Sequence, residues 1–145
     1  MEQTSGVENA PSGRKIVILI NDNIDGYVTR LWDTLQVEGW LDLYPITMVM
    51  FADVGLPEDS DDRTVWRFAQ AHQMLLLTAN RNMDGADSLE QTLREENKAD
   101  SLPVLTITNA ARLQERIYRE ECAERLLEIL LDIDNLLGAA RLYIP

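Results

Sequence analysis

Acidic and amide side chains directly follow several short apolar runs of this chain. Asn21 and Asp22 follow the run KIVILI (15–20), and Asp53 follows the run YPITMVMF (44–51). Other residues of these types are Asn23, Asp59, Asp61, Asp62, Asn80, Asn82, Asp84, Asp87 and Asn109. Carboxylate and amide oxygens are the ligands that Mg²⁺ and Mn²⁺ prefer. A cation held by them would activate water and stabilise negative charge on a phosphodiester.

The same residues also have a purely structural interpretation. Asp and Asn are the usual turn formers and helix N-caps, and a loop that leads from a strand into a helix needs both. Spacing alone leaves the two interpretations open.

The elements that must position these side chains follow from the apolar pattern. Four apolar runs, at 15–20, 44–51, 73–78 and 102–108, have the length of buried strands. Between them, apolar residues recur at helical spacing: Val28, Leu31, Trp32 and Leu35, then Val65, Phe68, Ala69 and His72, then Leu89 and Leu93. After the last run, we expect a helical segment from Ala110 to about Leu137 that is broken or bent near Arg119.

This order predicts a three-layer α/β fold, with a mostly parallel sheet of about four strands, helices on both faces and a helical C-terminus. A polar leader is predicted over 1–13 and a single domain over 14–145. In such sheets ligands bind beyond the carboxyl ends of the strands. We therefore expect the acidic and amide side chains to meet at one edge of the sheet.

Composition narrows the classes of function. The chain has 145 residues, with 13 basic and 25 acidic side chains, which give a net charge of −12. This charge repels phosphate backbones and argues against a passive nucleic-acid coat protein, but it permits an enzyme whose acids hold a cation. No apolar run approaches the roughly 20 residues of a membrane span. We expect a cytoplasmic protein without a membrane partner, in which the single Cys122 is a small buried apolar residue.

The chain lacks the sequence motifs of several common functional sites. The chain contains no G-x-S-x-G, G-x-G-x-x-G or G-x-x-x-x-G-K-[ST] pattern, which argues against a serine hydrolase and against dinucleotide or P-loop binding. A phospho-receiver domain needs an acceptor aspartate after its third strand and a lysine near its last. Here the third run ends in Thr78-Ala79-Asn80, and the lysines are Lys15 and Lys98.

Three segments together resemble the PIN-like domains, most closely a compact uncharacterised subgroup that is often found beside toxin–antitoxin genes. They are ILINDNI (18–24), GLPEDSDDRTVWRFA (55–69) and LLLTANRNMDG (75–85). The resemblance covers about 15–110 and implies a toxin-like ribonuclease that depends on Mg²⁺ or Mn²⁺ and cleaves single-stranded RNA. It also implies a three-layer α/β fold.

The resemblance implies which residues form the site. Asp22 takes the place of the acid that ends the first strand, unless Asn21 takes that place and leaves Asp22 beside it. Asp62, with Asp61 adjacent, takes the place of the acid that opens a later helix. Asn80 and Asn82 stand where the family has the two acids of Thr-x-Asp-x-Asp, so they would ligate a cation without contributing charge. Asp84 would supply the missing charge. The implied catalytic acids are Asp22, Asp62 and Asp84, and the implied metal ligands are these three with Asn80 and Asn82.

The arginines near this edge have two interpretations. Arg63, Arg67 and Arg81 would clamp a phosphate of the RNA, which would reconcile the acidic chain with a nucleic-acid substrate. Alternatively, they form surface salt bridges with Asp59, Asp61, Asp62 and Asp84.

A second function remains open: a catalytically inactive PIN-like module that acts by binding protein. Its partner would be an antitoxin or a second copy of the chain. We expect Trp66, Tyr143 and Ile144 to be exposed and to supply apolar contacts for such a partner.

Overall fold

A computed structural model describes residues 15–79 and 85–145. Within them, five strands form one all-parallel sheet in the order β2-β1-β3-β4-β5. The strands are β1 (Ile16–Ile20), β2 (Ile46–Val49), β3 (Leu75–Thr78), β4 (Val104–Ile107) and β5 (Arg141–Ile144). The predicted α/β fold with a parallel sheet is confirmed. The predicted number of strands was one too few, because β5 adds an edge strand beside β4.

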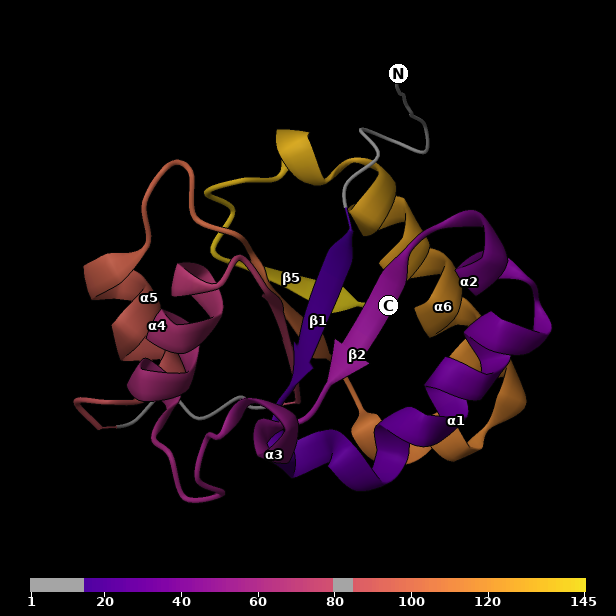
Figure 1. Ribbon diagram of the computed structural model, residues 1–145, viewed down its shortest axis with the longest axis horizontal. Helices are drawn as coiled ribbons and strands as arrows, with labels where there is room; N and C mark the ends of the chain where they lie inside the picture. Colours follow the sequence, from indigo (N-terminus) through magenta and orange to yellow (C-terminus); the bar gives the residue numbers. More distant parts are fainter. Residues whose placement is uncertain (1–14, 80–84) are drawn as a thin grey trace.

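Six α-helices accompany the sheet in the described residues (Figure 1). They are α1 (Asp25–Val37), α2 (Trp40–Leu43), α3 (Phe51–Val54), α4 (Asp62–Ala71), α5 (Leu89–Glu96) and α6 (Arg116–Leu131). Short 3₁₀ turns lie at Asp22–Ile24 (η3), Ala110–Gln114 (η4) and Ile133–Asn135 (η5). None of the helices in the described ranges is both long enough and apolar enough to cross a membrane.

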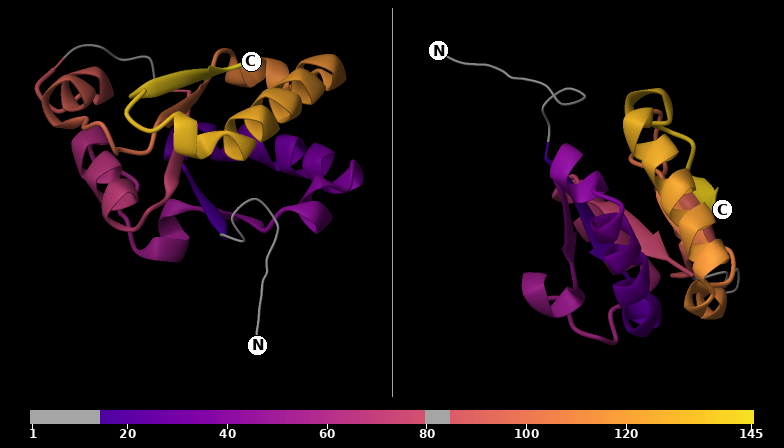
Figure 2. Two further views of the ribbon diagram at one scale, coloured as in Figure 1. Left: turned by 90° about the horizontal axis from the view of Figure 1, so that it is seen from above. Right: turned by 90° about the vertical axis from the view of Figure 1, so that its right-hand side faces the viewer.

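The two faces of the sheet carry separate apolar layers, because successive residues of a strand point to opposite sides. Ile18 and Ile20 of β1 pack with α1 and α6, whereas Leu19 packs with α4 and α5. Figure 2 shows α1 and α6 side by side along one face. Cys122 of α6 is fully buried in this layer, as predicted. The three-layer arrangement is therefore helices, sheet and helices.

The connection from β4 to β5 differs in handedness from the connection between β1 and β2. Between β1 and β2 the chain moves toward one edge of the sheet, and between β4 and β5 it moves toward the other. Both connecting helices, α1 and α6, nevertheless cover the same face. The β4–α6–β5 crossover therefore has the opposite hand to the β1–α1–β2 crossover. About 98% of crossovers between parallel strands of one sheet are right-handed.

Three local predictions were wrong. Trp66 is only 4% exposed, because α4 packs against both the sheet and α5. Ile144 is fully buried, because it belongs to β5 and points into the layer of α1 and α6. The C-terminal helical segment breaks at Glu115, between η4 and α6, and not near Arg119.

Candidate functional site

The carboxyl ends of β1 and β2 point toward the lower edge of the molecule in Figure 1, and the parallel pairing places the carboxyl end of β3 beside that of β1. From this edge the chain leaves β1 for β2 on one side of β1, and it later leaves β2 for β3 on the other side of β1. Open α/β sheets bind ligands where the strand order reverses in this way. The site predicted from the loops and the site favoured by the topology are therefore at the same edge.

Buried polar groups line the ends of the central strands. The backbone N–H of Asn21 donates to the carbonyl oxygen of Leu77 at 2.9 Å, so Asn21 extends the pairing of β1 with β3. Asn21 is 8% exposed, and Thr78 and Thr106 are fully buried near the ends of β3 and β4. Buried polar side chains thus lie at or near the ends of the central strands, whereas the rest of these strands is apolar.

Asp22 follows immediately and opens η3. It is partly buried just after the end of β1. Among the groups that the structure describes, its carboxylate has no hydrogen bond and no ion pair. Among the acids at this edge, Asp22 therefore stands out as partly buried and uncompensated by the described part of the chain.

The other acids at this edge are used to start helices. Asp53 Oδ2 accepts a hydrogen bond of 2.8 Å from the backbone N–H of Met50, the residue that precedes α3. Asp61 is the N-cap of α4, where its Oδ1 accepts from the N–H of Thr64 at 2.7 Å. That hydrogen bond holds the pKa of the Asp61 carboxyl below its ordinary value. For Asp53 and Asp61, the structural interpretation of the sequence is confirmed.

Asp62 joins two elements. Its Oδ2 accepts a hydrogen bond of 3.0 Å from the backbone N–H of Leu89, the first residue of α5. Ser88 caps the same helix, because its Oγ accepts from the N–H of Gln91 at 3.2 Å. Asp62 therefore fixes the start of α5 beside the start of α4.

Arg63 lies between α4 and the acids of α5, with a side chain that is only 14% exposed. It donates to Asp87 Oδ1 at 3.0 Å, to Glu95 Oε1 at 2.6 Å and to the carboxylate of Glu96. A further hydrogen bond of 2.7 Å reaches the carbonyl oxygen of Ala86. These hydrogen bonds, the one to Glu96 foremost, hold the pKa of the Arg63 guanidinium above its ordinary value.

Arg67 adds a second cation to the same cluster. Its Nη2 lies 2.7 Å from Glu96 Oε2, and its Nε lies 2.8 Å from Glu96 Oε1. The Arg67 guanidinium, together with Arg63, lowers the pKa of Glu96 to about 2. Arg63 is thus engaged in ion pairs, as the second interpretation held, but its partners are Asp87, Glu95 and Glu96.

The remaining predicted site residues are Asn80, Arg81, Asn82 and Asp84, which lie outside the described residues. In the two described ranges, no group of three or more His, Cys, Asp and Glu side chains is arranged to hold a metal ion. The structure therefore places Asp22 and Asp62 at the same edge of the sheet, but among the described residues they belong to no group of three arranged to hold a metal ion.

One partly buried polar contact between β4 and β5 was not predicted from the sequence. Arg141 of β5 donates from Nη1 to Thr106 Oγ1 at 2.9 Å and keeps its side chain 10% exposed. The signal was a threonine within an otherwise apolar strand, since a buried hydroxyl needs a hydrogen-bond partner.

No family model, no curated protein and no solved structure matches this chain. The likeness to PIN-like domains stays a prediction that rests on the three sequence segments.

Proposed function

We propose that this chain is a metal-dependent ribonuclease of PIN-like type, with Asp22 as the central metal ligand. The observation that carries the proposal is the partly buried Asp22 carboxylate, which has no compensating group among the described residues. Removing part of its hydration shell without a partner costs free energy, and a bound cation would supply that partner.

The position of Asp22 supports this role. It follows β1, at the reversal of strand order where open α/β folds bind ligands. Asn21, directly before it, offers a neutral amide oxygen of the hard type that Mg²⁺ accepts. A carboxylate and an amide on one short segment form a compact donor set.

The donors present fit Mg²⁺ or Mn²⁺ better than a closed structural site. Mg²⁺ usually keeps several waters and binds through one or two carboxylates together with the phosphate of its substrate. Asp62 would be the second carboxylate, and the N–H of Leu89 orients it, as groups in the outer shell commonly orient ligating carboxylates. A cation bound there would lower the pKa of a coordinated water and stabilise charge on the phosphodiester.

A second candidate is the catalytically inactive PIN-like module that binds protein, such as an antitoxin. The observation that favours it is the engagement of Arg63, which donates to three carboxylates and one carbonyl oxygen. A guanidinium held in this way is a structural clamp between α4 and α5, so it cannot serve as the phosphate clamp that we expected.

Cleavage of a fluorophore–quencher single-stranded RNA separates the two candidates. The wild-type chain is assayed with Mg²⁺, with Mn²⁺ and with EDTA, beside Asp22→Asn and the control Asp53→Asn. Asp53 lies at the same edge but caps α3, and asparagine retains an oxygen for that role. We expect metal-dependent cleavage that falls more than about tenfold in Asp22→Asn alone, since loss of even an outer-shell partner costs 10- to 100-fold in activity. Absence of cleavage with either metal supports the protein-binding module instead.

A further inference from the structure

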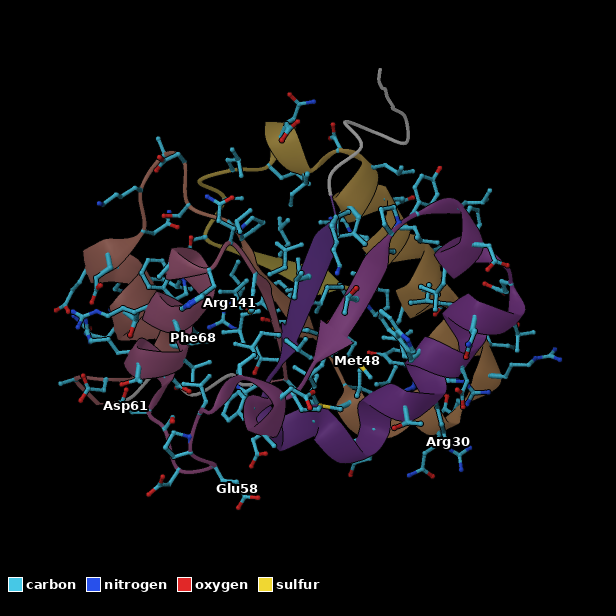
Figure 3. The ribbon with its side chains drawn as sticks, in the orientation of Figure 1. Arg30, Met48, Glu58, Asp61, Phe68 and Arg141 are labelled. Atoms are coloured by element: carbon cyan, nitrogen blue, oxygen red, sulfur yellow. The ribbon has the colours of Figure 1, made fainter. Side chains whose placement is uncertain are left out.

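The outer face of α1 and the start of α6 enclose an open surface groove of about 630 Å³. Arg30, Asp33, Val37 and Glu38 line it from the α1 side, and Arg116 and Arg119 line it from the α6 side. Figure 3 shows Arg30 pointing outward, away from the body of the molecule. This face lies opposite α4 and α5 across the sheet.

The charge of this groove differs from that of the chain. The protein carries a net charge of −12, whereas the three arginines of the groove balance its three acids, Asp33, Glu38 and Glu120. Two copies of a strongly acidic chain repel each other over most of their surface. A neutral face is where that repulsion is weakest.

Charges of both signs stand unpaired on α1. In the described part of the chain, Arg30, Asp33 and Glu38 form no ion pair and no side-chain hydrogen bond. By contrast, Arg119 is fixed by Thr34 Oγ1 at 3.3 Å and by the carbonyl oxygen of Gln114 at 2.8 Å. The groove therefore has a rigid wall on α6 and available charges on α1.

Exposed aliphatic side chains accompany these charges. Val37 is 86% exposed at the end of α1, and Ile117 is 68% exposed in the first turn of α6. Arginine is enriched at protein interfaces, and exposed aliphatic side chains supply apolar area that a partner can cover. The three carboxylates and the absence of aromatic side chains from the lining argue against a nucleic-acid strand, which favours cations and stacking platforms.

The spacing on α1 is self-complementary. Arg30 and Glu38 lie four residues before and four residues after Thr34, so each is about 6 Å along the helix axis from Thr34. Two copies of α1 packed antiparallel around a twofold axis near Thr34 place Arg30 of each copy opposite Glu38 of the other. A twofold interface forms such a pair twice. Val37 of one copy then covers the aliphatic stem of Arg30 of the other.

We propose that the outer face of α1 is a homodimer interface, in which Arg30 pairs with Glu38 of a second copy. This inference is independent of the proposed ribonuclease function. It also moves the expected self-association away from Trp66 and Ile144, which are buried.

Sedimentation velocity over a concentration series tests the interface. We expect wild type to dimerise, and Arg30→Glu and Glu38→Arg each to raise the dimer dissociation constant by about tenfold or more. The double variant that carries both changes restores the pair with reversed charges, so its dissociation constant should return toward wild type. Lys98→Glu is the control for Arg30→Glu, because it makes the same change of charge at an exposed site outside the groove.

Three results overturn the proposal. The first is a wild-type chain that stays monomeric throughout the series. The second is a dimer dissociation constant that is the same in Arg30→Glu as in Lys98→Glu. The third is a double variant that dimerises more weakly than either single variant. Circular dichroism of each variant shows whether the fold is retained, and both positions are exposed, so we expect it to be.

Discussion

Asp62 Oδ2 accepts the backbone N–H of Leu89 at 3.0 Å and so connects the first residue of α4 to the first residue of α5. The two residues are 27 positions apart in the chain. The contact sets where α5 begins, at the same edge of the sheet as Asp22. Asp62 therefore has a structural role whether or not it also binds a cation.

Variants of Asp62 separate these two roles. Asp62→Ala removes the acceptor and leaves a helix N–H unpaired, so we expect a loss of about 1 kcal/mol in the free energy of unfolding. Asp62→Asn keeps an oxygen and should lose much less. Urea denaturation measures both. Equal losses for alanine and asparagine would show that the charge, and not the hydrogen bond, provides the stability.

The ion pairs of Glu96 predict how stability depends on pH. Because the pKa of Glu96 is about 2 in the folded chain, below its ordinary value of 4.5, its stabilising effect is present above pH 4.5. The effect is lost as the pH falls from about 4.5 toward about 2. We expect Glu96→Gln to be less stable than wild type at pH 7 and to approach it near pH 2.

Thermal unfolding across this pH range checks the prediction. Glu128→Gln is the control, because Glu128 is 68% exposed in its side chain and pairs with Arg125 at 3.4 Å. Exposed pairs of this kind contribute little. A Glu96→Gln variant whose stability follows wild type at every pH would contradict the role that we assign to Arg67 and Arg63.

Trp66 provides a test of the corrected core. Its ring is buried, and its Nε1 has no hydrogen-bond partner among the described residues. Trp66→Phe removes the unpaired donor and keeps most of the apolar area, so we expect little loss of stability or a small gain. Trp66→Ala should cost about 3–5 kcal/mol, the usual range for a large aromatic side chain in a core. An exposed Trp66 would make both substitutions nearly neutral in urea denaturation.

The central part of the fold follows from local pattern, whereas its last strand does not. The four apolar runs are long enough to be strands that are buried on both faces, and each contains an observed strand. The segment Arg141–Ile144 is a short edge strand with a single neighbour, and Tyr143 is 43% exposed. Its pairing depends on the return of α6 across the face that α1 already covers, which no local signal specifies.

Trp66 shows a related limit. The helical stripe of Val65, Phe68 and Ala69 assumes that α4 has one buried side. In the structure α4 contacts both the sheet and α5, so its buried surface is wider than the stripe and includes Trp66. Contacts with a second neighbour cannot be read from the spacing of one helix.

The sequence predicted where the acidic and amide side chains lie, but it did not predict which of them cap helices and which have no partner among the described residues. A cap and a metal ligand both require an oxygen-bearing side chain between a strand and a helix. Asp53 and Asp61 became caps, whereas Asp22 acquired no partner among the described residues. That difference depends on the direction in which each loop turns, which residue types alone do not encode.

Binding of Mn²⁺ measured by isothermal titration calorimetry tests the central claim most directly, because it needs neither the RNA target nor turnover. Wild type, Asp22→Asn and Asp53→Asn are titrated under identical conditions. We predict saturable binding that weakens by more than about tenfold in Asp22→Asn, as loss of metal-site groups generally does, and that is unchanged in Asp53→Asn. Binding of equal strength in wild type and Asp22→Asn, or no binding to wild type at millimolar Mn²⁺, would contradict the account.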